Sequence, residues 1–378
     1  MLKIVGRALF LACSWTWCIG MWLPVYLTRD WGWHGWAVFL VCNALGAMLV
    51  GLTLSAAASR QRVADNLGVM RLFSVVTILF HSAWLFMILP HLSAHSAIRQ
   101  GYLGGIGAAL LLISAFFLAR TPGKWWPLFA LFTTAATIAA WILSTRTGHT
   151  LQLPPNSGVQ PPLALLFATP TILLGFACCP HLDLTFHRVR QELPGPAGAA
   201  AFVLAFGVAF PAFMLYSLLY AGGLIDRGSW SLYLLIHLTC QSVFTVAAHL
   251  RELMPGGLAS YGPRWPTRRT QLLLAMLATS ACVMIPFALP AVFFRRAYEC
   301  MIAPYALVFP IAVILAAQGG PWTRRRWITW IALTIAALPF IALGYLGQQH
   351  ELLLASTAIT LIAALIPTPR RAPAPRPA

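Results

Sequence analysis

The chain has 378 residues, of which 60% are hydrophobic and only 9% are charged, and its mean hydropathy is +0.78. One soluble core cannot bury so much apolar side chain, so the composition excludes a soluble enzyme and predicts an all-α, polytopic integral membrane protein. The net charge of +17 would suggest a nucleic-acid partner in a soluble protein. Here the basic residues fall between apolar runs, where they set membrane topology, and we expect no nucleic-acid partner.

In chain order, a window of about 20 residues, the length that a hydrocarbon layer about 30 Å thick requires, predicts twelve membrane spans. They cover residues 8–28, 36–58, 68–90, 102–119, 126–144, 163–186, 199–224, 230–249, 271–294, 301–318, 327–346 and 351–367. The first resembles a signal peptide, but its apolar stretch continues to Thr28 without a small-residue cleavage site. We expect it to be retained as a span.

The distribution of basic residues supports this count of spans. With the N-terminus in the cytoplasm, the outer segments contain only Arg29, Arg99, Arg146, Arg227, Arg295 and Arg296. The cytoplasmic segments contain the other 19 of the 25 lysines and arginines, as the positive-inside rule expects. The sequence therefore predicts a bacterial inner-membrane or plasma-membrane protein with both termini in the cytoplasm.

The connections between spans are too short to hold a soluble domain. We expect residues 1–367 to form a single transmembrane domain. Residues 368–378 are rich in proline and arginine and lack a hydrophobic stripe, so we expect a disordered cytoplasmic tail near lipid headgroups. The eight cysteines are scattered without CxxC spacing, which favours free thiols over a disulfide framework or a zinc site.

Two spans carry a glycine and a proline at matching depth. In the first span Gly20 is followed by Pro24, and in the sixth Gly175 is followed by Pro180. Proline removes a backbone hydrogen bond and glycine lowers the cost of unwinding, so each pair can free backbone groups near the bilayer midplane. Breaks at corresponding positions of two halves point to a transporter site. The alternative is an ordinary kink in each helix, because other spans also contain proline.

The first span leaves the cytoplasm and the sixth enters it, so spans 1 to 5 can recur inverted as spans 6 to 10. In span count, orientation and two broken helices, the chain resembles the LeuT-like fold of the amino acid-polyamine-organocation (APC) superfamily. This resemblance implies repeats at residues 1–144 and 163–318, followed by two appended helices at 327–367. It also implies that the two breaks face each other across a central site.

Asp183 is the acidic residue that the sequence places inside a span, just after the break in the sixth span. An ionisable group at such a position usually faces a cavity, so Asp183 is a candidate for meeting a cation, a proton or a substrate amine, with His181 as its neighbour. The alternative is a structural ion pair with Arg188 or another cytoplasmic arginine at the inner membrane surface.

Other polar residues inside spans are weaker candidates. His81 lies near the middle of the third span and could face the substrate or carry a coupling proton, or be an ordinary core histidine. In the eighth span Thr239, Ser242 and Thr245 share a helix face. Sodium-coupled members of the superfamily use neighbouring hydroxyls there, but this chain lacks an adjacent pair. The alternative is that its hydroxyls bond back to their own helix.

Aromatic and small residues complete the candidate site. Trp17 lies too deep for an interfacial belt and could stack on a substrate, although packing is the simpler interpretation. Asn43, Gly46 and Gly51 in the second span are typical of close helix packing, with Asn43 as a hydrogen-bonding link between helices. The expected substrate contacts are Trp17, Gly20, Pro24, His81, Gly175, Cys179 and Pro180, and the expected coupling residues are Asp183, His181, Thr239 and Ser242.

These observations favour a secondary active transporter that moves a small organic solute by alternating access, coupled to Na⁺ or H⁺ and without a bound cofactor or metal. Two alternatives remain at this stage. A lipid-linked transferase would need acidic residues in interfacial loops, for which Asp30 is the candidate. A haem-binding membrane protein would use His81 and His237 as ligands, because the two lie at comparable depth on different spans.

Overall fold

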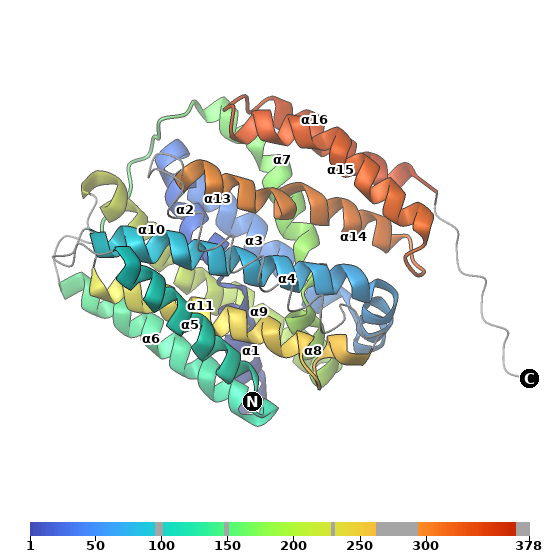
Figure 1. Ribbon diagram of the computed structural model, residues 1–378, viewed down its shortest axis with the longest axis horizontal. Coiled ribbons are helices and arrows are strands. Elements are labelled where there is room, and N and C mark those ends of the chain that lie inside the picture. The colour runs from blue at the N-terminus through green and yellow to red at the C-terminus, as the bar shows by residue number, and fades with distance from the viewer. Residues whose placement is uncertain (95–100, 147–150, 228–230, 262–293, 368–378) are drawn as a thin grey trace, which may run out of the picture.

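The structure is a computed structural model that describes residues 1–94, 101–146, 151–227, 231–261 and 294–367, and every regular element in these ranges is helical (Figure 1). Short 3₁₀ turns, labelled η, join several of the α-helices. The first half of the chain contains α1 (Leu2–Trp15), α2 (Cys18–Trp31), α3 (Trp33–Thr53), α4 (Ala56–Ala94), α5 (Gly101–Ala119), η1 (Gly123–Trp125) and α6 (Trp126–Arg146).

The second half repeats the pattern of long helices and includes two π-helical segments, η3 and η6. Its elements before residue 262 are α7 (Pro162–Cys178), η2 (Cys179–Leu182), α8 (Leu184–Glu192), α9 (Pro196–Leu204), η3 (Ala205–Ala209), α10 (Phe210–Arg227), α11 (Leu232–Leu253) and η4 (Leu258–Tyr261). Those after residue 293 are α13 (Phe294–Ala303), η6 (Pro304–Val308), α14 (Phe309–Ala317), α15 (Arg324–Tyr345), α16 (Leu352–Ile362) and η7 (Ala363–Leu365).

These helices match the predicted spans. Eight of the described helical segments are long and apolar enough to cross a membrane, and α1 with α2 makes a ninth span that is bent by 58°. Two shorter apolar helices, Gly104–Ala119 and Leu352–Leu365, lie at the predicted spans 102–119 and 351–367. Eleven of the twelve predicted spans therefore contain a helix at the expected place. The predicted span 271–294 lies, apart from its last residue, outside the described residues.

Apolar stripes on the outer helices face away from the protein. On α3, Val41, Leu45, Leu49 and Leu52 are exposed at helical spacing, and α6 and α15 carry similar stripes. In water such stripes would be unfavourable, whereas lipid tails solvate them. The chain is therefore an integral membrane protein with a helical bundle as its transmembrane domain.

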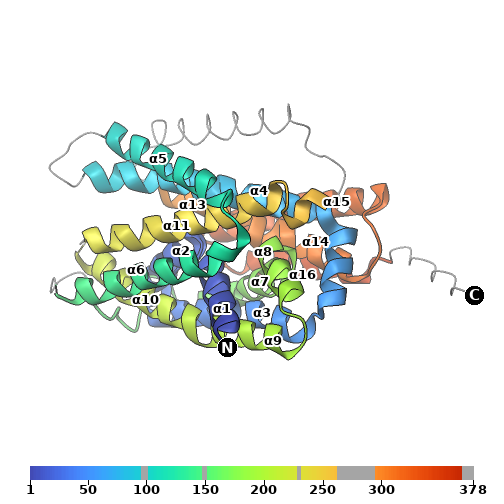
Figure 2. The same ribbon diagram turned by 90° about the horizontal axis from the view of Figure 1, so that it is seen from below.

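The broken helices lie inside this bundle. Figure 1 shows α15 and α16 together at one edge and α5 and α6 at the opposite edge, with α2, α3 and α7 between them. In the perpendicular view of Figure 2, α7 and α8 lie between α5 on one side and α9 on the other. Helix α1 packs on α6, α9 and α11, and α8 packs on α4 and α11. Both breaks are thereby enclosed by other helices.

The first span breaks at Thr16 and Trp17, four residues before the predicted position. Trp17 is extended (φ −74°, ψ 174°), and α2 starts at Cys18. The Trp17 indole turns back and donates to the Ser14 carbonyl at 2.6 Å, while the Thr16 hydroxyl donates to the Ala12 carbonyl at 2.7 Å. These side chains satisfy carbonyl groups at the end of α1 and so stabilise the break.

The prediction of unwinding at Gly20 and Pro24 is wrong, because both residues lie inside α2. A proline ring clashes with the carbonyl of the residue four positions before it, which here is Gly20. A glycine at that position leaves room for the helix to adjust. The pair therefore accommodates a proline within α2, and the side chains around Thr16 and Trp17 determine where the span breaks.

The sixth span breaks close to the predicted place. Helix α7 continues through Gly175 and ends at Cys178, and Pro180 lies in the 3₁₀ turn η2. Asp183 then adopts an extended conformation (φ −77°, ψ 111°) and caps α8. The expected break in the sixth span is confirmed at Pro180, whereas Gly175 remains helical.

Small residues on α3 bring neighbouring helices close, as the sequence predicts. A Cβ atom on Gly46 would collide with the Phe176 carbonyl of α7, and one on Gly51 would collide with the Phe202 ring of α9. Asn43 accepts a hydrogen bond from the Trp15 indole at 2.5 Å and so links α3 to the end of α1. The predicted role of Asn43 as a link between helices is confirmed.

Candidate functional site

A cavity lies between the two breaks. Trp15, Trp17 and Gly20 line it from the first span, and Gly175 and Cys179 line it from the sixth. The remaining walls come from α3, η6 and its flanking helix α13, and α15. The two breaks therefore face each other across one cavity, as the resemblance implies.

The lining of this cavity is apolar and aromatic. Phe176, Tyr305 and Tyr345 add to the two tryptophans, and no charged residue is among the described residues that line it. The two polar exceptions already have partners, because Asn43 binds the Trp15 indole and the Thr171 hydroxyl lies 3.0 Å from the Thr357 hydroxyl. The cavity therefore suits a largely apolar, uncharged molecule.

The predicted substrate contacts divide into two groups. Trp17, Gly20, Gly175 and Cys179 line the cavity, and the Cys179 thiol donates to the Tyr305 carbonyl at 3.4 Å. The expectation that Pro24, His81 and Pro180 also line it is wrong. Pro24 lies inside α2 and Pro180 lies in the turn η2. His81 hydrogen-bonds to the backbone at the first break.

His81 holds the first break from α4. Its Nε2 accepts a hydrogen bond from the Cys18 amide at 3.1 Å, so its Nδ1 carries the proton and donates to the Thr77 carbonyl at 2.8 Å. Both ring nitrogens are occupied and the side chain is completely buried. This leaves no nitrogen for a substrate or a haem iron, which removes the haem alternative at this residue.

Replacing His81 with phenylalanine should destabilise the break, because the buried Cys18 amide would lose its acceptor. We expect a loss of about 1 to 3 kcal/mol in the free energy of unfolding, measured by detergent-driven unfolding of the purified protein. Asparagine, whose carbonyl oxygen can accept a hydrogen bond, should recover part of the loss. A phenylalanine variant as stable as the wild type would contradict the assigned bond.

Other side chains bind the freed backbone of the first span. The Tyr298 hydroxyl of α13 donates to the Cys18 carbonyl at 2.9 Å, and the Tyr220 hydroxyl of α10 donates to the Met21 carbonyl. The Thr245 hydroxyl of α11 donates to the Cys13 carbonyl at 3.2 Å. Four helices besides the first span therefore hold this backbone, which fixes its geometry near the cavity.

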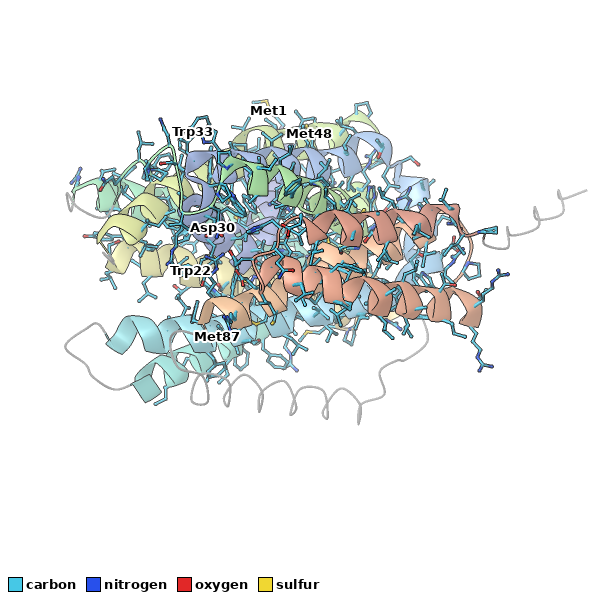
Figure 3. All side chains as sticks on the ribbon, turned by 90° about the horizontal axis from the view of Figure 1, so that it is seen from above. Met1, Trp22, Asp30, Trp33, Met48 and Met87 are labelled. Atoms are coloured by element: carbon cyan, nitrogen blue, oxygen red, sulfur yellow. The ribbon has the colours of Figure 1, made fainter. Side chains whose placement is uncertain are left out.

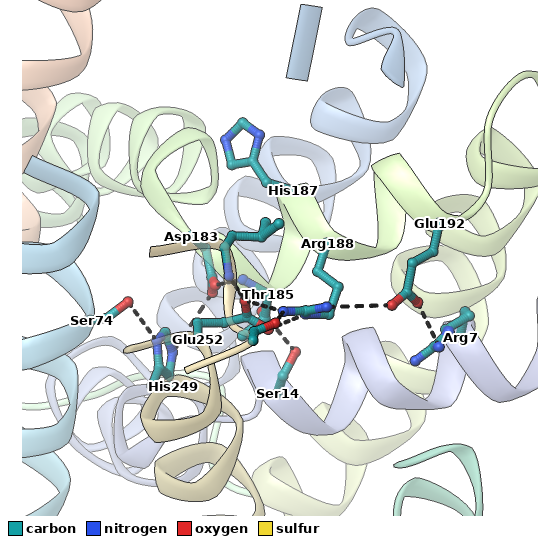
Figure 4. A network of polar contacts seen from close by, with 12 residues as sticks. Arg7, Ser14, Ser74, Asp183, Thr185, His187, Arg188, Glu192, His249 and Glu252 are labelled. Atoms are coloured by element: carbon teal, nitrogen blue, oxygen red, sulfur yellow. Dashed lines mark hydrogen bonds and ion pairs between the residues drawn. The ribbon is translucent and has the colours of Figure 1, made fainter. Parts of the chain in front are cut away.

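Asp183 lies at the second break and is completely buried. One carboxylate oxygen, Oδ1, accepts a hydrogen bond from the Thr185 amide at 2.7 Å. The other oxygen, Oδ2, lies 3.8 Å from Nε2 of His249 on α11 (Figure 4). The expected neighbour His181 instead approaches Arg62, with its Nδ1 at 3.2 Å from the guanidinium. The position of Asp183 agrees with the prediction, but its neighbour is His249.

The alternative of an ion pair between Asp183 and Arg188 is also wrong. Arg188 binds Glu252 through two hydrogen bonds, one of them 2.8 Å long, and lies 3.6 Å from Glu192. Glu192 in turn pairs with Arg7 of α1 at 2.5 Å. We call these four residues, Arg7, Arg188, Glu192 and Glu252, the Arg188 cluster. It ties α1, α8 and α11 together (Figure 4).

A second cluster lies beyond the opposite end of the cavity. Arg295 of α13 donates to both carboxylate oxygens of Asp30 on α2, at 2.8 and 2.6 Å, and to Glu299 at 2.7 Å. We call Asp30, Arg295 and Glu299 the Asp30 cluster. Figure 3 shows Asp30 within the bundle, whereas Trp33 lies at its edge. Asp30 is bound on both oxygens and 2% exposed, so it is a poor candidate for the catalytic residue of a transferase.

The Asp30 cluster lines a second cavity. His350, in the connection between α15 and α16, also lines it, and burial lowers the pKa of His350. The second cavity adjoins the first, because both are lined by Leu23, Ile172, Ile302 and Tyr345. A single layer of side chains therefore separates the central cavity from the Asp30 cluster.

Two hydroxyls of α11 that were expected to be coupling residues have hydrogen-bond acceptors within their own helix. Thr239 donates to the Leu235 carbonyl at 2.8 Å, and Ser242 donates to the Leu238 carbonyl at 2.7 Å. Both hydroxyls thus bond back to their own helix, which is the alternative that the sequence left open. Among the described residues, no group of three or more His, Cys, Asp or Glu side chains could hold a metal ion.

Sequence reasoning missed His249, Glu252 and Arg295. The predicted eighth span ended at residue 249, because Arg251 and Glu252 lower the hydropathy of the window, whereas α11 continues to Leu253 and buries Glu252 completely. Asp183 is therefore not the one acidic residue inside a span. The available signal was the spacing of His249 and Glu252, which places both on one face of a helix.

Comparisons with known proteins agree with the fold. No protein-family model matches the sequence, and no curated protein matches it. Two mutant structures of the manganese transporter of Eremococcus coleocola are similar, with TM-scores of 0.52 and 0.51 and identities of 14% and 15%. Each alignment covers 96% of this chain and 92% of that chain.

A structure of Mhp1, a nucleobase-cation-symport-1 family transporter with bromovinylhydantoin bound, aligns at a TM-score of 0.49 and 11% identity. That alignment covers 96% of this chain and 90% of that chain. The similarity to the manganese transporter extends over almost the whole of this chain. The chain is a polytopic membrane protein with the LeuT-like fold.

Proposed function

We propose that the protein is a secondary active transporter that moves a small organic solute through the central cavity by alternating access. The observation that carries this proposal is the position of the cavity, between two helix breaks and between two ion-pair clusters. Release of a solute on either side needs the ion-pair cluster on that side to open. The broken spans supply hinges for this opening.

The ion-pair clusters are suited to close the two sides in turn. Arg7 precedes the first span and Arg188 follows the sixth, so the positive-inside rule assigns the Arg188 cluster to the cytoplasmic side. The Asp30 cluster then faces the outside. Because α1 carries Arg7 and α2 carries Asp30, the two halves of one broken span belong to opposite closures. One closure can open while the other stays shut.

The cavity lining favours an uncharged solute with an aromatic or apolar body. A charged solute would lose its hydration without meeting an opposite charge among the described lining residues, at a cost of several kcal/mol. Trp15, Trp17 and Tyr305 instead offer aromatic faces and edges. Uptake against a gradient would be driven by a coupled ion, for which Asp183 is the candidate site.

The test is uptake into proteoliposomes with a panel of radiolabelled probes. Nicotinamide, thymine and indole represent uncharged ring compounds, leucine represents a zwitterion, and Mn²⁺ represents the ion named for the structural neighbour. We expect saturable uptake of at least one uncharged probe under an ion gradient. Uptake of Mn²⁺ or leucine alone would overturn the solute class, and uptake of no probe would count against transport.

Filling the cavity should weaken binding without loss of fold. Ala306 lines the central cavity, so Ala306→Phe should reduce the affinity for a transported probe by at least about tenfold, measured by uptake at varied concentration. The matched control is Ala139→Phe on the exposed face of α6, which should leave uptake unchanged. Equal uptake by both variants would show that the solute does not use this cavity.

A further inference from the structure

Two buried side chains near the cavity each have one free polar atom, and these atoms face each other. Asp183 Oδ2 and His249 Nε2 lie 3.8 Å apart, and both side chains are completely buried. Neither atom has a hydrogen-bond partner among the described residues. The second polar atom of each side chain is engaged, Oδ1 by the Thr185 amide and Nδ1 by the Ser74 hydroxyl at 3.2 Å.

The free-energy cost of burying these two atoms depends on whether a proton lies between them. A buried carboxylate or imidazolium without a partner is expensive, and so is a buried polar atom without a hydrogen bond. A proton placed between Oδ2 and Nε2 satisfies both atoms at once, either as a neutral acid beside a neutral ring or as an ion pair. The two atoms need to approach by about 1 Å to reach hydrogen-bond distance.

We propose that Asp183 and His249 share one exchangeable proton and that this proton is the ion coupled to transport. The proposal rests on the proposed transport function and names its coupling ion. A metal cation is a poorer occupant, because the described residues contain no cluster of three ligating side chains here.

The other titratable groups around the pair already have partners. Glu252 of α11 binds Arg188, and His81 of α4 binds backbone groups on both sides. The Tyr305 hydroxyl of η6 donates to the Thr77 hydroxyl at 2.9 Å, and the Cys179 thiol donates to the Tyr305 carbonyl. Further out, His187 contacts Ser59, His181 contacts Arg62, Arg7 pairs with Glu192, and the Arg251 guanidinium lies over the Trp126 ring.

Trp17 connects this proton site to the cavity. Its ring lines the central cavity and packs edge-on against His249, with 5.6 Å between ring centroids. A solute that displaces the Trp17 ring therefore changes the surroundings of His249. The converse also holds, because linkage between two sites is reciprocal in free energy.

Movement of α8 against α11 would change the proton affinity of the pair. Asp183 starts α8, and His249 lies on α11, so separating the two helices separates Oδ2 from Nε2. The Arg188 cluster joins the same two helices on the cytoplasmic side. Opening that side would therefore break the shared-proton contact, which makes proton release and inward opening parts of one step.

The proton site can be tested without knowing the solute. Infrared difference spectroscopy of the full-length protein in lipid, titrated between about pH 4 and pH 9, reports protonation of a buried carboxyl through its C=O band. We expect one such band to disappear in Asp183→Asn. In His249→Gln its midpoint should shift by at least about one pH unit, a tenfold change in proton affinity. The matched control is His237→Gln, a completely buried histidine on the same helix, which should leave the band unchanged.

Several outcomes would overturn the proposal. A band unaffected by His249→Gln, or no titrating band that Asp183→Asn removes, would show that the pair does not share a proton. If Asp183→Asn does not fold, His249→Gln decides alone. Uptake of nicotinamide or another panel probe that follows a Na⁺ gradient and ignores a pH gradient would overturn proton coupling but leave the transporter proposal intact. A titrating pair without uptake of any probe would leave the proton site intact and count against transport.

Discussion

Replacing Arg188 with glutamine is expected to lower the free energy of unfolding by about 3 to 5 kcal/mol. Glu252 is completely buried, and Arg188 binds both of its carboxylate oxygens. Glutamine is shorter and uncharged, so the variant would leave a buried carboxylate without its counter-charge. Unfolding in a denaturing detergent, followed by tryptophan fluorescence, would measure the loss.

Two further variants distinguish a lost charge partner from general damage. Arg188→Met combined with Glu252→Leu removes both charges and should recover most of the stability, because the desolvation cost disappears with the pair. Arg60→Gln changes an exposed arginine and should alter the free energy of unfolding by less than about 0.5 kcal/mol. A double variant as unstable as the single one would contradict the buried-pair explanation.

Gly46→Ala should be nearly as damaging, although it adds one methyl group. The new Cβ atom would collide with the Phe176 carbonyl, which belongs to the backbone of α7 and cannot rotate away. Helices α3 and α7 must then separate, which also disturbs the wall of the central cavity. We expect a loss of about 3 kcal/mol in the free energy of unfolding, at the upper end for overpacking of a core.

The matched substitution for Gly46→Ala is Gly105→Ala on α5, where the new Cβ atom has no neighbour within 4 Å. That variant should be as stable as the wild type or slightly more stable, because alanine favours the helix. Comparing the folded yield of the two variants after purification isolates the contact between α3 and α7. Equal yields and equal unfolding curves would mean that this contact can relax at little cost.

Hydropathy and charge predict most of the fold, and local pattern predicts part of the site. The spans can be predicted because each needs about 20 apolar residues to cross the hydrocarbon layer. The break at Pro180 can be predicted because proline cannot donate a backbone hydrogen bond. The first break is harder to place. Its position depends on the Trp17 indole and on His81. His81 accepts a hydrogen bond from the Cys18 amide, although the two residues are 63 positions apart in the sequence.

The neighbours of Asp183 show why the remainder of the site could not be predicted from the sequence. Sequence spacing suggests partners nearby in the chain, such as His181 and Arg188, yet both turn to other helices. The observed partner, His249, comes from α11, and its approach depends on how α8 and α11 pack. Helix packing of this kind is a property of surfaces from distant segments, which hydrophobic periodicity does not specify.

The four side chains shared by the two cavities, Leu23, Ile172, Ile302 and Tyr345, imply two barriers in sequence on the side of the Asp30 cluster. A solute first has to displace this layer of side chains, and then the Asp30 cluster, which ties α2 to α13, has to open. Toward the Arg188 cluster, α1, α8 and α11 have to separate. Helix separations of this kind are collective motions that take microseconds to milliseconds. We therefore expect a transported solute to stop in the second cavity before the Asp30 cluster opens.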